Sequence, residues 1–167
     1  MVSPRLIIAI ILCAGTASGR HTLCPQESSA LADWLTSHPE YRAATSADCA
    51  CAEDIRKVRA GWGGVPAVPD YDPYRVVGDF NKDGLEDAAV VVVKRSNPLH
   101  GFGLLVFNGN RKGSPYSLAF SKMGLDLQGN GLFFGPPAGE NLLLLGRFYS
   151  DDGVVVTPKK ETYTLSQ

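Results

Sequence analysis

The chain has 167 residues, of which 44% are hydrophobic, and its 16 Lys and Arg residues against 17 Asp and Glu residues give a formal net charge of −1. This length is sufficient for one domain with a buried core. The near-neutral charge and the lack of long basic runs give no basis for a nucleic-acid or anionic-membrane partner.

The first nineteen residues have the pattern of an export signal. Arg5 supplies a positive charge, Leu6–Leu12 is an apolar run, and Ala17–Gly19 supplies the small residues that precede cleavage. The apolar run is shorter than the ~20 residues that span a bilayer, and no later stretch is longer. We therefore predict a signal peptide at 1–19 and a periplasmic or secreted protein at 20–167, without a membrane span.

Residues 20–60 form a segment with two predicted helices. The first helix is expected over Gln26–Ser37, because Leu31, Trp34 and Leu35 share one face and a His-Pro pair follows. The second is expected over Cys49–Ala60, after an aspartate cap and before a glycine.

Three cysteines follow the predicted cleavage point, and an oxidising compartment favours one disulfide among them. In the second predicted helix Cys51 points to the core, whereas Cys49 lies on another face. We predict a Cys24–Cys49 bridge with Cys51 buried and free; Cys24–Cys51 is the alternative.

A Gly- and Pro-rich strap, 61–73, connects this segment to a β-rich part, 74–167, within a single domain. Short links between apolar stretches favour an antiparallel meander. The fold class predicted is α+β: two helices packed on a bent sheet or an open barrel. The expected strands are Tyr74–Gly78, Ala88–Lys94, Phe102–Asn108, Tyr116–Ser121, Gly131–Phe134, Leu142–Phe148, Gly153–Thr157 and Glu161–Leu165.

Oxygen-bearing residues recur at alternate positions in the loop of the first hairpin. Asp79, Asn81 and Asp83 are followed by a glycine that tolerates a sharp turn, and then by Leu85 and Asp87. Ca²⁺ takes six to eight oxygen ligands, which side chains at this spacing and the Leu85 carbonyl could supply. The alternative is an ordinary Asp- and Asn-rich turn. We predict a calcium site formed by these five residues.

The D-x-N-x-D-G-x-x-D spacing, with a short strand before it and a Val-rich strand after it, resembles the calcium loops of FG-GAP and VCBS-type repeats. An EF-hand is not expected, because the twelfth position of the loop is Val90 and a strand follows. The resemblance implies Ca²⁺ as the cofactor. The chain contains one copy of the loop, so a many-bladed propeller is not expected.

The sequence has neither a G-x-S-x-G elbow nor an H-E-x-x-H zinc motif, and we predict no enzymatic activity. Recognition is instead expected from loop-borne residues, since Tyr and Arg are frequent in binding hot spots. The candidates are Tyr71, Tyr74, His100, Arg111 and Tyr149.

The small, exported, β-rich build resembles periplasmic inhibitors and immunity proteins. That resemblance implies a protein partner, either a cell-wall hydrolase or a toxin. The alternative is an adhesion or glycan-binding module, as FG-GAP and VCBS repeats often are, but these usually act in arrays.

Overall fold

The computed structural model describes residues 22–64, 66–110, 116–135, 142–150, 152–160 and 162–166. The predicted signal peptide and Arg111 lie outside these residues. The elements are α1 (Pro25–Ser37), β1 (Tyr41–Ala43), the 3₁₀ helix η1 (Ser46–Asp48), α2 (Ala52–Ala60), β2 (Arg75–Gly78), β3 (Asp87–Lys94), β4 (Phe102–Asn108), β5 (Ser117–Leu125), β6 (Asn130–Phe134), β7 (Leu143–Arg147), β8 (Gly153–Lys159) and β9 (Thr162–Ser166). No helix among the described residues is long and apolar enough to cross a membrane.

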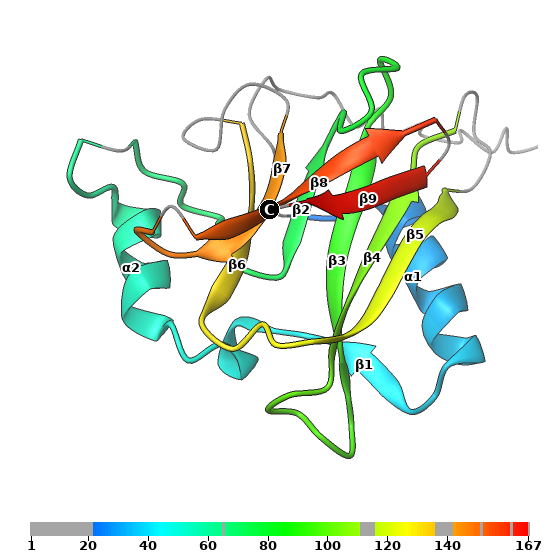
Figure 1. Cartoon of the computed structure of the whole chain (residues 1–167), viewed down its shortest axis with the longest axis horizontal. Helices are drawn as coiled ribbons and strands as arrows, with labels where there is room; N and C mark the ends of the chain where they lie inside the picture. Colours follow the sequence, from blue (N-terminus) through cyan, green and yellow to red (C-terminus); the bar gives the residue numbers. More distant parts are fainter. Residues whose placement is uncertain are drawn as a thin grey trace, which may run out of the picture.

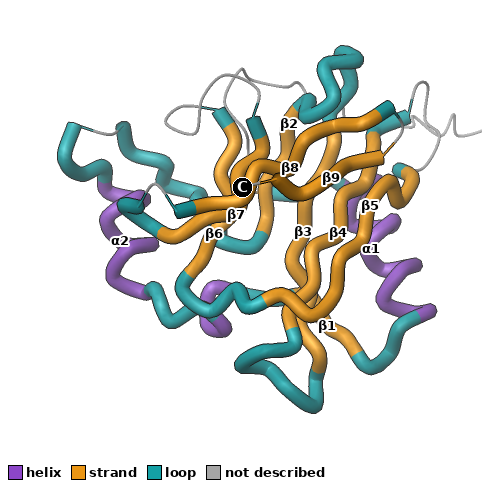
Figure 2. Tube along the Cα trace, in the orientation of Figure 1, coloured by secondary structure: helices purple, strands orange, loops and turns teal. Residues whose placement is uncertain are grey.

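The predicted α+β class is confirmed, but the strands form two open antiparallel sheets and not one bent sheet (Figures 1 and 2). In the first sheet the order is β1-β3-β4-β5, and β2 pairs with β3 beside β1. The second sheet, β6-β7-β8-β9, is a simple meander. The chain therefore changes sheets once, between β5 and β6.

Strand β3 is central because both of its faces are buried. Val91 and Val93 belong to one hydrophobic cluster, whereas Val90 and Val92 belong to the other. Successive side chains of a strand point to opposite faces, so an uninterrupted Val run requires packing on both sides. Strand β3 accordingly lies inside the first sheet, paired with β1 and β2 on one side and with β4 on the other.

The two helices lie on opposite sides of the first sheet: α1 packs against its strands, whereas α2 lies beside β6 of the second sheet (Figure 1). Ala30 and Leu31 of α1 pack with Val90 and Val92. Ile55 of α2 belongs to the other cluster, which also contains the inward residues of the second sheet. The second sheet therefore lies on the α2 side, and α1 packs on the other face.

The predicted Cys24–Cys49 bridge is wrong. The structure pairs Cys49 with Cys51, with the Cα atoms 5.1 Å apart, and leaves Cys24 free and buried. Cys24 caps α1 on one face of the first sheet, whereas Cys49 and Cys51 lie in the cluster on the opposite face. The sheet therefore separates Cys24 from both other cysteines.

The second helix begins later than predicted, which explains the error. Residues 46–48 form η1, and α2 begins at Ala52 after an extended Cys49. Because Cys49 is not helical, the helical angle used to separate it from Cys51 does not apply. Both side chains are buried.

Strand β1, which the sequence analysis missed, is attached to η1 by an ion pair. Arg42 Nη1 donates to Asp48 Oδ2 at 2.7 Å, and Asp48 Oδ2 also accepts from the Thr45 backbone N–H at 2.8 Å. The Arg42 guanidinium, with these Thr45 contacts, lowers the pKa of Asp48 from 3.8 to about 2. Only 10% of the Asp48 side chain is exposed, so solvent screens the pair less than an open surface pair.

This ion pair predicts a loss of stability in acid. Above about pH 5 Asp48 is ionised in both states and the pair contributes fully; as the pH falls from about 5 to 2 the unfolded chain takes up the proton first. The free energy of unfolding should fall by about 1–2 kcal/mol over this range on account of Asp48, allowing for the partial exposure of Arg42. Urea denaturation at several pH values should show this component in the native protein and not in Asp48→Asn. Parallel acid profiles for the two proteins would contradict it.

Candidate functional site

The predicted calcium loop is the connection between β2 and β3, and its own side chains hold it together. Asp79 Oδ1 accepts from the Asp83 N–H at 3.0 Å, and Asp79 Oδ2 accepts from the Gly84 N–H at 2.9 Å. Lys82 and Gly84 have positive φ angles of 64° and 83°. A Cβ on Gly84 would meet nothing within 4 Å, so the glycine is needed for its backbone conformation and not for space.

The structure brings Asp79, Asn81 and Asp83 together at the tip of this loop. Asn81 Oδ1 accepts from the Asp83 N–H at 3.0 Å, and Asn81 Nδ2 donates to Asp83 Oδ2 at 3.1 Å. Asp83 Oδ1 accepts from the Leu85 N–H at 2.8 Å. Each of these oxygens accepts one described donor and retains acceptor capacity. The loop tip therefore gathers oxygens of the kind that the calcium prediction requires.

Asp87, the fifth predicted ligand, lies at the base of the loop and has no exposed surface. Its Oδ2 accepts from the N–H groups of Phe80 and Asn81 at 3.0 and 3.3 Å, and from the Tyr163 hydroxyl at 3.1 Å. Its Oδ1 accepts from the Gly109 N–H at 3.0 Å. These four donors match the approximate acceptor capacity of a carboxylate. Asp87 is thus an internal anchor that fixes the loop to two other parts of the chain.

Gly109 lies too close to the Glu86 backbone to carry a side chain. A Cβ on Gly109 would lie 2.1 Å from the Glu86 carbonyl oxygen. Glycine at this position lets the turn after β4 reach the Asp87 carboxylate.

Two titratable groups of this buried contact, Asp87 and Tyr163, have shifted pKa values. Burial raises the pKa of Asp87 to about 6, although its hydrogen bonds act in the opposite direction. Burial also raises the pKa of Tyr163, and the charges of Asp87, Asp83 and Asp79 raise it further. Among the described residues no Lys or Arg forms an ion pair with these three aspartates. The described residues also contain no group of three or more His, Cys, Asp or Glu side chains that could hold a metal ion.

Two of the predicted recognition residues are core residues. Tyr71 and Tyr74 are 1% and 0% exposed, and both belong to the hydrophobic cluster on the α2 side. The strap packs against α2, since the Val68 N–H donates to the Val58 carbonyl at 3.0 Å. This packing turns the Tyr71 ring inward against Phe133 and Phe148. The prediction that these tyrosines form a surface was therefore wrong.

Tyr149 is exposed, as predicted, and belongs to an aromatic cluster that we define as Trp62, Tyr149 and Lys57. The Trp62 and Tyr149 rings meet edge to face with centroids 5.3 Å apart. Lys57 Nζ stands 5.3 Å from the Trp62 centroid and 5.8 Å from the Tyr149 centroid. Such cation–π contacts order the lysine over the two rings. His100 is also exposed but lies in the separate turn between β3 and β4 (Figure 1).

The aromatic cluster leaves a large apolar surface in solvent. Trp62 and Tyr149 are 56% and 52% exposed. Tyr149 has a positive φ of 54°, which is uncommon for a bulky residue. The sequence analysis did not select Trp62 or Lys57. The available signal was a bulky indole among three glycines, Gly61, Gly63 and Gly64, which offer no neighbouring side chains to bury it.

The Asp87 anchor predicts that Tyr163→Phe destabilises the protein. The variant removes the hydroxyl that contacts Asp87 and Asn108, and leaves buried oxygens without that partner. We expect a loss of about 1–3 kcal/mol in the free energy of unfolding, measured by urea denaturation. Tyr41→Phe is the control, because the Tyr41 hydroxyl forms no hydrogen bond within the described residues. Equal stabilities of the two variants would contradict the anchor.

Comparisons with family models, with curated proteins and with solved structures found no match to this chain.

Proposed function

We propose that this chain is an exported, calcium-binding protein of the cell envelope that acts by binding and inhibiting another protein, a cell-wall-targeting enzyme or toxin. The observation that supports action by protein binding is the exposed pair of rings in the aromatic cluster. Tyr and Trp are strongly enriched among the residues that dominate protein–protein binding energy. A soluble chain gains nothing in folding from leaving two such rings in solvent.

The position of the aromatic cluster favours insertion into a partner. Trp62 follows α2 on a projecting turn, and Tyr149 stands on the turn between β7 and β8 (Figure 1). A Cβ on Gly63 or Gly64 would meet nothing within 4 Å, so this turn is open to solvent. Rings on a projecting turn suit the cleft of an enzyme, and Lys57 adds a positive charge beside them. This position supports the proposal of an inhibitor that blocks a cleft.

Calcium is proposed as a brace for the β2–β3 loop. Asp79, Asn81 and Asp83 would hold the ion with the Leu85 carbonyl, while Asp87 anchors the loop from below. The ion would offset the mutual repulsion of carboxylates that have no cationic partner among the described residues. The proposed ligands come from one continuous segment, so we assign calcium to stability and not to turnover.

The calcium proposal predicts a thermal shift. An ion that binds only the folded state at a hundred times its Kd adds about 2.7 kcal/mol to the free energy of unfolding. Scanning calorimetry in calcium and in chelator should then differ by roughly 5–10 °C in Tm. Asp83→Ala should abolish the difference, and Asp126→Asn, a change in another exposed turn, should retain it. Identical melting curves in calcium and in chelator would contradict calcium binding and would favour an ordinary turn.

The recognition proposal predicts inhibition of a lytic enzyme. The purified protein should be tested against muramidases, amidases and endopeptidases that act on peptidoglycan, and against secreted toxins. We expect inhibition of one class, and a loss of at least about a hundredfold in affinity for Trp62→Ala combined with Tyr149→Ala, since hot-spot truncations cost 2 kcal/mol or more each. Leu99→Ala is the matched control, because Leu99 is 55% exposed in a different turn.

Three outcomes would contradict this proposal. Full inhibition by the double variant would place recognition elsewhere on the surface. Binding of the protein to glycan strands, lost in the same variant, would favour the adhesion module. Hydrolysis of peptidoglycan, glycans or esters by the pure protein, lost on chelation while the fold persists, would favour an enzyme.

A further inference from the structure

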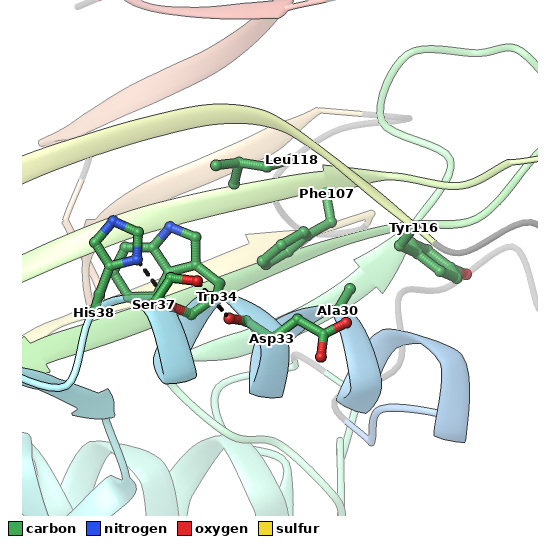
Figure 3. Close-up of a pocket in the computed structure, with 8 residues that line it drawn as sticks. All are labelled: Ala30, Asp33, Trp34, Ser37, His38, Phe107, Tyr116 and Leu118. Carbon is green, nitrogen blue, oxygen red and sulfur yellow. Dashed lines mark hydrogen bonds between the residues drawn. The ribbon is translucent and has the colours of Figure 1, made fainter.

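A second candidate site lies on the face of the first sheet opposite the aromatic cluster. It is a groove of about 350 Å³ between α1 and the edge strand β5 (Figure 3). Its lining consists of Ala30, Asp33, Trp34, Ser37, His38, Phe107, Tyr116 and Leu118. A volume of this size is within the range of small-molecule sites.

The groove exists because one helix is too narrow to cover the sheet. α1 packs over β3 and β4, where Val90, Val92 and Leu105 are buried. An α-helix with its side chains is about 10 Å wide, whereas three inter-strand spacings already cover about 14 Å. Strand β5 is left at the margin, and its Leu118 is 45% exposed.

The walls of the groove are largely aromatic and are held in place. Trp34 stacks on His38 with centroids 4.0 Å apart and planes 9° apart. His38 Nδ1 donates to the Trp34 carbonyl at 2.8 Å, so the other ring nitrogen of a neutral His38 is an acceptor. Phe107 and Tyr116 form the sheet side of the groove (Figure 3).

The polar groups of the groove favour a positive ligand. None of the eight lining residues is Lys or Arg, and Asp33 contributes a carboxylate. Within the described residues the Asp33 carboxylate forms neither an ion pair nor a hydrogen bond, although the Asp33 backbone carbonyl accepts from Ser37. The Tyr116 hydroxyl already donates to Glu27 Oε1 at 3.0 Å. The groove therefore offers ring faces, the Asp33 carboxylate and the Trp34 indole N–H to a ligand, and no cationic side chain.

We propose that this groove binds a small organic cation, an ammonium group on an apolar or aromatic stem. The stem lies against Trp34, Phe107 and Leu118, and the ammonium pairs with Asp33. Cations are attracted to the faces of aromatic rings, most strongly to Trp, and a carboxylate beside the rings adds direct charge complementarity. This site is independent of the proposed inhibitory function, because it is on the other face of the first sheet.

A series of three probes that differ in charge tests the proposal. Phenethylammonium, neutral 2-phenylethanol and anionic 3-phenylpropionate have similar shapes, and calorimetry on the full chain gives their affinities. We expect the cation to bind at least tenfold more tightly than the alcohol, and the anion most weakly. Bound cation should shift the NMR signal of the Trp34 indole N–H and leave that of Trp62 unchanged.

Variants locate the binding without disturbing the core. Asp33→Asn should weaken the binding of phenethylammonium about tenfold, which corresponds to about 1.4 kcal/mol. The same variant should reduce the difference in affinity between the cation and the alcohol. Glu40→Gln removes another exposed carboxylate just after the same helix and should have no effect. Leu118→Lys places a positive charge on the exposed edge strand and should abolish binding of the cation.

Equal affinities for cation and alcohol, or tighter binding of the anion, would overturn the proposal. So would an unchanged affinity in Asp33→Asn. The proposal of a small ligand would also be wrong if a lysine-containing tripeptide bound at the same residues more than tenfold tighter than phenethylammonium. That result would favour a peptide.

Discussion

The carboxylate of Asp87 links three parts of the chain that are distant in sequence. It receives the N–H groups of the β2–β3 loop, the N–H of Gly109 after β4 and the hydroxyl of Tyr163 from β9. A buried carboxylate is tolerated only when its acceptor capacity is satisfied, and four donors achieve this here. The first sheet, the acidic loop and the last strand of the second sheet are thus held in register around one side chain. The loop geometry on which calcium binding is proposed depends on that anchor.

The first sheet also divides the molecule chemically. Its two faces support separate hydrophobic clusters, one with α1 and one with α2 and the second sheet. This division separates Cys24 from the Cys49–Cys51 pair. It also places the aromatic cluster and the groove on opposite sides of the molecule. A protein partner at one site and a small cation at the other could therefore bind at the same time.

The two proposed recognition sites differ in how their rings are held. In the aromatic cluster the rings project and are ordered by Lys57 and by the backbone of Tyr149. In the groove Trp34 is stacked on His38, and Phe107 is buried in the sheet. Projecting rings suit insertion into another molecule, whereas recessed rings suit the reception of a ligand. The proposed partner classes follow from this difference.

The sequence by itself determined those features that depend on local pattern. Both helices and the eight later strands followed from hydrophobic periodicity and turn residues. The acidic loop also followed, because spacing and a glycine define its turn. Only the tertiary structure decided which cysteines meet, because two faces of a sheet are separated by packing and not by distance along the chain. It decided that Tyr71 and Tyr74 are core residues, since the strap turns them inward, and that Trp62 stays in solvent. It also gave Asp87 its four donors, of which Gly109 follows β4 and Tyr163 lies in β9, and local pattern does not encode how these segments are arranged.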